Sequence, residues 1–138
     1  MTTISATVLT AFIGWSLLLL ILMEGLRTRL VVKGAVVSNA FTPDNASLSP
    51  FMQRLARAHA NCLEGLPVFG GLLLLAIATG RTGVTDGLAP WFLAARFIQS
   101  GIHLLSLSVP AVNARFSAFV VQLGIAAYWV WALLIGSV

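Results

Sequence analysis

Polar side chains that can bind an anion recur at helical spacing in the stretch RLARAHANCLEGLPVF, residues 54–69. Each residue of an α-helix advances by about 100°, so four of these side chains would share an arc of roughly 80° on one face: Arg54, Arg57, Asn61 and Glu64. His59 would lie on the opposite side of the same helix, where its expected role is packing. Because guanidinium groups bind carboxylates and phosphates, this face is suited to an anion.

Two further polar stripes lie in the apolar segments nearer the C-terminus. One contains Arg96, Gln99, Ser100 and His103, and the other contains Arg115 and Gln122 seven residues apart. A charged side chain at membrane depth costs about 2.5–3.5 kcal/mol, so stripes that face lipid would be hard to tolerate. We therefore expect these side chains to face protein or a water-filled cavity, with His103 a better functional candidate than His59.

Arginines outnumber carboxylates along these stripes. Glu64 is the stripe carboxylate, against the arginines Arg54, Arg57, Arg96 and Arg115. A ligand with carboxylate, phosphate or sulfonate groups would supply the missing negative charge. In the alternative, Glu64 and Arg96 simply pair to hold two helices together. The first apolar segment also ends in a polar turn, which contains Glu24, Arg27 and Thr28.

The elements that must position these side chains are membrane-spanning helices. The chain has 138 residues, of which 59% are hydrophobic and 9% charged, and its mean hydropathy is +0.97. A soluble domain needs far more charged surface than this, whereas roughly 20 apolar residues suffice to cross a bilayer. We expect one all-α domain over residues 1–138, with transmembrane helices at about 6–30, 50–79, 87–107 and 112–135. The first of them has no basic residue before it, so we expect it to be retained rather than cleaved.

Several kinds of site are excluded. Cys62 is the only cysteine, so burial as a small apolar residue is its expected role, and no cysteine-based metal site or internal disulfide can form. We find no Ser-His-Asp arrangement, no carboxylate pair and no two-histidine zinc spacing, so no metal is expected. The net charge of +4 reflects basic residues beside the first and third loops, which predicts cytoplasmic loops and external termini rather than binding to nucleic acid.

The chain resembles the MAPEG family, the membrane-associated proteins in eicosanoid and glutathione metabolism, in the stretch Arg54-x-x-Arg57-Ala58-His59-x-Asn61-x-x-Glu64-x-x-Pro67. This stretch is similar to the signature at the start of the family's second helix. The likeness extends over nearly the whole chain, because four helices, a long first loop and arginines on and after the third helix all recur. The resemblance is to a small member of bacterial type, which implies a multi-pass protein of a bacterial inner membrane.

The resemblance implies a homotrimer that binds glutathione between helices one and two of one subunit and helices three and four of its neighbour. The implied glutathione contacts are Arg27, Arg54, Arg57, Asn61, Glu64, Arg96, Gln99 and His103. Glu64 would receive the ammonium of the γ-glutamyl end, and the arginines would receive the carboxylates. Arg115 matches the arginine that family enzymes place beside the thiol, so it is the expected catalytic residue. Each unit by which a cation lowers the thiol pKa favours the reactive thiolate by about 1.4 kcal/mol.

The implied function is a membrane-bound glutathione-dependent transferase or peroxidase that detoxifies lipophilic electrophiles or lipid hydroperoxides, with glutathione as cosubstrate. Family enzymes commonly have tyrosines on the third-helix face, where this chain has Gln99 and His103, and some have Ser and Tyr where it has Phe116 and Phe119. These departures disfavour prostaglandin-type isomerase chemistry. A second possibility is a noncatalytic lipid-binding or scaffold member of the family. A third is a small multidrug transporter, in which Glu24 would be the membrane carboxylate.

Overall fold

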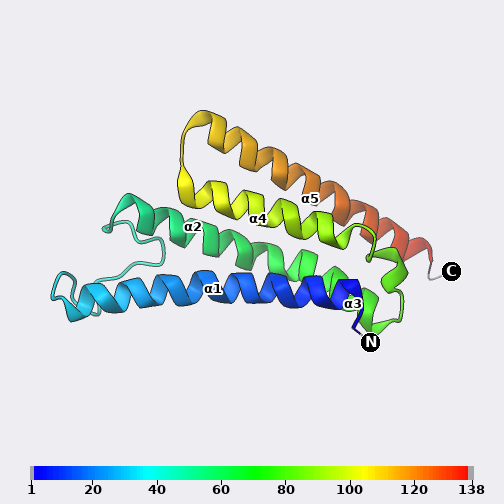
Figure 1. Ribbon diagram of the computed structural model, residues 1–138, viewed down its shortest axis with the longest axis horizontal. Coiled ribbons are helices and arrows are strands. Elements are labelled where there is room, and N and C mark those ends of the chain that lie inside the picture. The colour runs from blue at the N-terminus through cyan, green and yellow to red at the C-terminus, as the bar shows by residue number, and fades with distance from the viewer. Residues whose placement is uncertain (1, 137–138) are drawn as a thin grey trace.

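The computed structural model describes residues 2–136 as an all-helical bundle whose long helices lie side by side (Figure 1). The helical elements are α1 (Ile4–Val32), α2 (Pro50–Gly65), a π-helical segment (Leu66–Gly70), α3 (Gly71–Ala78), a short 3-10 turn (Thr82–Val84), α4 (Ala89–Leu105) and α5 (Val109–Ile135). Because α2, the π segment and α3 follow one another without a break, the chain crosses the bundle four times. The four predicted helices are confirmed, with ends that differ by a few residues.

Three of the four crossings are long and apolar enough to span a membrane: Ile4–Val32, Pro50–Ala78 and Val109–Ile135. The remaining helix, α4, has 17 residues and would be about 25 Å long. Apolar side chains also cover the outer faces, since Leu17, Leu18 and Ile21 of α1 are 52%, 53% and 60% exposed. An outer surface of this kind is stable against lipid tails and unfavourable in water.

Hydroxyl side chains start three of the helices. Thr3 accepts a hydrogen bond from the backbone N–H of Ala6, and Ser49 accepts one from that of Met52. Ser108 does the same at the start of α5. Proline then occupies the first or second position of α2 and α5. It can stand there because the first N–H groups of a helix have no partner within the helix.

Pro67 explains why the second crossing is not one regular α-helix. Proline cannot donate to the carbonyl four residues earlier, and its ring clashes with that carbonyl in an α-turn. The chain widens into the π segment at this point and returns to α geometry at Gly71, whose N–H bonds back to the carbonyls of Pro67 and Val68. The helix predicted over residues 50–79 is therefore not a continuous α-helix, because residues 66–70 form one wider turn.

Aromatic rings fill the core between the four crossings. Phe92 of α4 meets Phe12 edge-on at 5.4 Å, stacks on Phe69 at 4.8 Å and meets Trp129 at 6.0 Å. All four rings are 0–2% exposed. Each crossing therefore contributes one aromatic anchor, which fixes the relative depth of the helices.

Side-chain bonds close the end of the bundle where α3 leads into α4 (Figure 1). Arg81 donates to the carbonyl oxygens of Leu133 at 2.7 Å and Ala132 at 3.0 Å, which satisfies the last turn of α5. Asp86 accepts from both the backbone N–H and the hydroxyl of Ser5, at 2.8 and 2.6 Å. These contacts tie α1 and α5 to the same connecting segment.

Candidate functional site

Polar side chains from three helices converge on a pocket of about 310 Å³ that opens between α2, α4 and α5. Its lining consists of Asn61, Gln99, His103, Val112, Arg115, Phe116 and Phe119. Four of the residues predicted as ligand contacts or catalyst thus lie together: Asn61, Gln99, His103 and Arg115. Gln99 and His103 share this pocket because they are four residues apart on α4, which turns them to the same side of the helix. Both are buried there.

Hydrogen-bonding capacity in this pocket is left unused. Gln99 accepts a bond of 2.8 Å from the amide of Gln122 on α5, which leaves its own NH₂ group as a donor. Nδ1 of His103 and one terminal nitrogen of Arg115, Nη1, are buried without a partner in the described part of the chain. Buried polar atoms without partners are costly, so the pocket is suited to a polar or anionic ligand.

Arg96 does not reach this pocket but lies behind Asn61. Its side chain is 0% exposed and packs between the rings of Phe12 and Phe69, with 5.3 and 5.4 Å from the guanidinium carbon to the ring centroids. Nη1 donates a 2.6 Å bond to the side-chain oxygen of Asn61, so Arg96 would act on a ligand only through that amide. Within residues 2–136, Nε and Nη2 of Arg96 have no hydrogen-bond partner.

The close fit around Arg96 also explains Gly65. A Cβ atom at this position would lie 2.7 Å from Nη2 of Arg96 and 3.2 Å from the ring of Phe69. With any larger residue at this position, the guanidinium would have to move. Sequence reasoning missed this role, because the contact joins residues on two helices.

The rest of the α2 stripe lies at the surface of the single chain. Arg57 and Glu64 are exposed, and Arg54 donates a 2.9 Å bond to the carbonyl of Leu104 at the end of α4. The opposite, apolar face of α2 occupies the core instead, with Leu55 and Cys62 both 0% exposed. Glu64 lines a smaller neighbouring pocket of about 120 Å³, which shares Asn61 and Phe119 with the first.

The alternative in which Glu64 pairs with Arg96 is wrong for the single chain. The ion pair found in the described residues joins Arg27 to Glu24, and Arg96 bonds to Asn61 instead. The geometry explains the difference, because Glu64 points outward from α2 whereas Arg96 is enclosed by aromatic rings.

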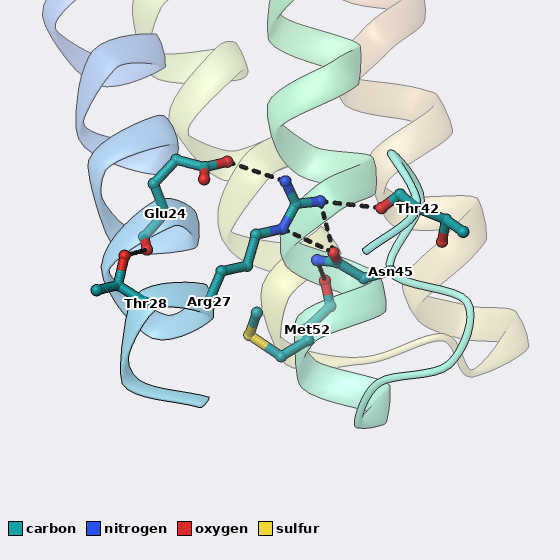
Figure 2. A network of polar contacts seen from close by, with 6 residues as sticks. All are labelled: Glu24, Arg27, Thr28, Thr42, Asn45 and Met52. Atoms are coloured by element: carbon teal, nitrogen blue, oxygen red, sulfur yellow. Dashed lines mark hydrogen bonds and ion pairs between the residues drawn. The ribbon is translucent and has the colours of Figure 1, made fainter. Parts of the chain in front are cut away.

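Arg27 lies on a different side of the bundle and holds the first loop (Figure 2). It donates to Glu24 at 2.9 Å, to the carbonyl of Thr42 at 3.0 Å, and twice to the side-chain oxygen of Asn45, at 3.0 and 2.6 Å. Asn45 is 0% exposed, and its NH₂ donates to the carbonyl of Met52 at 2.8 Å. In this chain Arg27 thus joins α1, the loop and α2.

Asn45 is a residue that sequence reasoning missed. Its φ of 54° lies in the left-handed region, which asparagine tolerates better than most residues. Proline, aspartate and asparagine are common turn residues, so the run Pro43-Asp44-Asn45 is typical of a turn, although not of a buried one. Beside it, hydrogen bonds from the hydroxyl of Thr42 and the N–H of Ala46 hold the pKa of the Asp44 carboxyl below its usual value.

The packing roles expected for His59 and Cys62 are confirmed. His59 is buried on the side of α2 that faces α1, where it lines a third pocket together with Met23 and Arg27. Cys62 is 0% exposed, with its sulfur 3.6 Å from the hydroxyl of Ser100. Neither residue lines the pocket between α2, α4 and α5.

The model of the MAPEG family matches residues 5–135. This chain belongs to the MAPEG family. No significant match was found among curated proteins or among solved structures. Members of the family are membrane glutathione-dependent transferases or peroxidases, or proteins of eicosanoid pathways, and their fold is a four-helix membrane bundle. The protein is accordingly a multi-pass integral membrane protein.

The departures of this MAPEG protein from the family's usual residues gather in one place. Gln99, His103, Phe116 and Phe119, which stand where some family enzymes have tyrosine or serine, all line the pocket beside Arg115. The phenyl rings of Phe116 and Phe119 give the pocket apolar surface, and its other lining residues supply amide and imidazole groups. Such a pocket can hold an anionic molecule next to an apolar one. Within residues 2–136, no group of His, Cys, Asp or Glu side chains is arranged to hold a metal ion.

Proposed function

We propose that this MAPEG protein is a glutathione-dependent transferase or peroxidase that acts on lipophilic electrophiles or lipid hydroperoxides. The observation that supports the proposal is the convergence of Arg115 with three neutral polar side chains, Asn61, Gln99 and His103, on one pocket beside an apolar wall. Arg115 carries a permanent charge, and part of its guanidinium is buried without a partner among the described residues. A thiolate would supply that partner.

Glutathione has two carboxylates and one ammonium group, and the exposed α2 residues match this pattern. In the proposed binding mode Glu64 receives the ammonium and Arg57 a carboxylate, while Asn61, fixed by Arg96, donates its free NH₂. Charge-assisted bonds of this kind are about twice as strong as neutral ones. Arg57 and Glu64 are exposed in the single chain, so we propose that a homotrimer encloses them between subunits.

The proposed chemistry begins with loss of the thiol proton to solvent, which Arg115 favours by stabilising the thiolate. In conjugation, the sulfur forms a bond to an electrophilic carbon, and a halide leaves with the bonding electron pair. In peroxide reduction, the sulfur attacks the terminal oxygen of a hydroperoxide, the O–O bond breaks, and the alkoxide takes a proton to become an alcohol. A second glutathione then reduces the resulting sulfenic acid, which yields glutathione disulfide and water.

The test measures the ionisation of bound glutathione. Ultraviolet difference absorbance across pH should show thiolate near neutral pH in the wild-type protein, whereas Arg115→Ala should return the thiol pKa toward about 8.5. Arg115→Lys should keep part of the effect, because the ammonium supplies charge without the planar fork. Arg29→Ala is the matched control, since Arg29 lies outside the pocket and should leave the thiol pKa unchanged. A wild-type thiol that titrates like free glutathione would refute the proposal.

A second candidate function, a noncatalytic lipid-binding or scaffold protein, is favoured by the two phenyl rings beside Arg115. Phe116 and Phe119 cannot donate a hydrogen bond to a leaving group, unlike the serine and tyrosine of some family enzymes. Bound glutathione with an unshifted thiol, and no turnover of an aryl halide or a lipid hydroperoxide, would establish this alternative. A transporter is less well supported, because Glu24 is exposed beyond the uncharged stretch of α1 and is paired with Arg27.

The proposed location is a bacterial inner membrane, with the loop over residues 33–49 and the turn after α4 in the cytoplasm. The basic residues that flank these two connections support this orientation. Glutathione would then reach the pocket from the cytoplasm, while the apolar substrate would enter from the bilayer.

A further inference from the structure

The last turns of α1 and the start of α2 enclose a pocket of about 460 Å³, which none of the proposed glutathione-binding residues lines. We propose that this pocket binds the head group of an anionic phospholipid. Its phosphate would lie against Arg29 and Lys33, its glycerol end would pack on Leu30 and Phe51, and its acyl chains would run past Leu26 toward the hydrocarbon. The inference is independent of the function proposed above, because the two pockets share no residue.

The charge of the pocket selects an anion. Arg29 and Lys33 are four residues apart on α1 and so lie one turn apart on the same face. Both side chains are exposed, and within the described residues neither side chain makes a hydrogen bond or an ion pair. No acidic side chain lines the pocket. The N-terminus of the 16-residue helix α2 adds the positive end of its dipole at Ser49 and Phe51.

The depth of the pocket selects a lipid. The uncharged part of α1, Ile4–Met23, would be about 30 Å long, which matches the hydrocarbon thickness of a bilayer. Arg29 lies six residues beyond Met23, a rise of about 9 Å, so its side chain reaches the layer of lipid head groups. Phe51, 39% exposed, and the partly buried Leu26 and Leu30 supply an apolar floor that a free phosphate ion does not need.

The test compares two lipids with identical acyl chains. Native mass spectrometry of the full-length, detergent-purified protein would be recorded with added phosphatidylglycerol or phosphatidylcholine. The wild-type protein should prefer phosphatidylglycerol. Arg29→Gln with Lys33→Gln should weaken phosphatidylglycerol binding about twenty-fivefold, at about fivefold for each cation, and leave phosphatidylcholine binding unchanged. The exchange Arg29→Lys with Lys33→Arg keeps both charges and should retain the preference.

Three results would overturn the proposal: no preference in the wild-type protein, a preference that persists in the double glutamine variant, or complete displacement of the lipid by an equal concentration of glycerol 3-phosphate. The last result would identify a soluble anion as the ligand, because glycerol 3-phosphate has the phosphate without acyl chains. Circular dichroism of the double glutamine variant serves as the folding control. Its helicity should match that of the wild-type protein, since both side chains are exposed and unpaired in the described structure.

Discussion

Gly65→Ala tests whether the buried guanidinium of Arg96 is held as tightly as the structure indicates. The added methyl group would lie 2.7 Å from Nη2 of Arg96, so the guanidinium would have to move. A flexible arginine normally yields at little cost. Here its faces are covered by Phe12 and Phe69, and Nη1 is bonded to Asn61.

The expected destabilisation follows from two opposing effects. Overpacking of an enclosed site costs about 1–3 kcal/mol, whereas replacing a helical glycine by alanine recovers up to about 1 kcal/mol. We expect a net loss of about 1–2 kcal/mol of stability. A displaced Arg96 would also loosen Asn61, and a charge-assisted bond contributes about 1.5–3 kcal/mol. Glutathione binding should therefore weaken roughly tenfold.

Thermal unfolding in detergent, followed by circular dichroism, measures the first effect, and titration calorimetry with glutathione measures the second. Gly71→Ala is the matched control, because it is the same substitution six residues further along the same membrane crossing. A Cβ at Gly71 would have no neighbour within 4 Å, so this variant should be as stable as the wild type or more stable. Equal melting temperatures for the two variants would refute the tight packing inferred around Arg96.

Three further outcomes are expected. Asn45→Ala should lower the melting temperature, since it removes the hydrogen-bond acceptor of Arg27 and places alanine at φ 54°. Asn45→Gly relieves only the backbone strain, so it should recover a minor part of the loss. In calorimetry, Glu64→Gln should weaken glutathione binding at least tenfold, and a larger effect of His59→Ala would contradict the proposed binding mode. Mass measurement in mild detergent should give a trimer, and a monomer that binds glutathione would exclude a site completed by a neighbouring subunit.

The helices could be predicted from the sequence because apolar length and charge determine membrane crossings. The stripe on α4 was equally predictable, since Gln99 and His103 are four residues apart and a helix turns such residues to one face. Arg115 joins them because the connection between α4 and α5 is short, which forces the two helices to lie antiparallel. Local periodicity and connection length therefore determine most of the pocket.

The environment of Arg96 could not be predicted in this way. Its two aromatic neighbours come from α1 and the π segment, at sequence separations of 84 and 27 residues. Periodicity shows which residues share a face, but not which face of another helix they meet. For the same reason the sequence could not show that Arg27 bonds to a buried asparagine of the first loop.

The charges at the two ends of the bundle differ, so the membrane potential acts on them differently. At one end, the charges of Arg81 and Asp86 cancel. The other end is where α1 ends and α2 and α5 begin. It has six basic and two acidic side chains, which gives a net charge of +4. The basic ones are Arg27, Arg29, Lys33, Arg54, Arg57 and Arg115, and the acidic ones are Glu24 and Asp44. One charge that crosses the bilayer gains about 2.3 kcal/mol per 100 mV, so the whole end would gain about 9 kcal/mol. An energised membrane that is negative inside would therefore favour the orientation proposed above, with this end on the inner side, whichever ligands the protein binds.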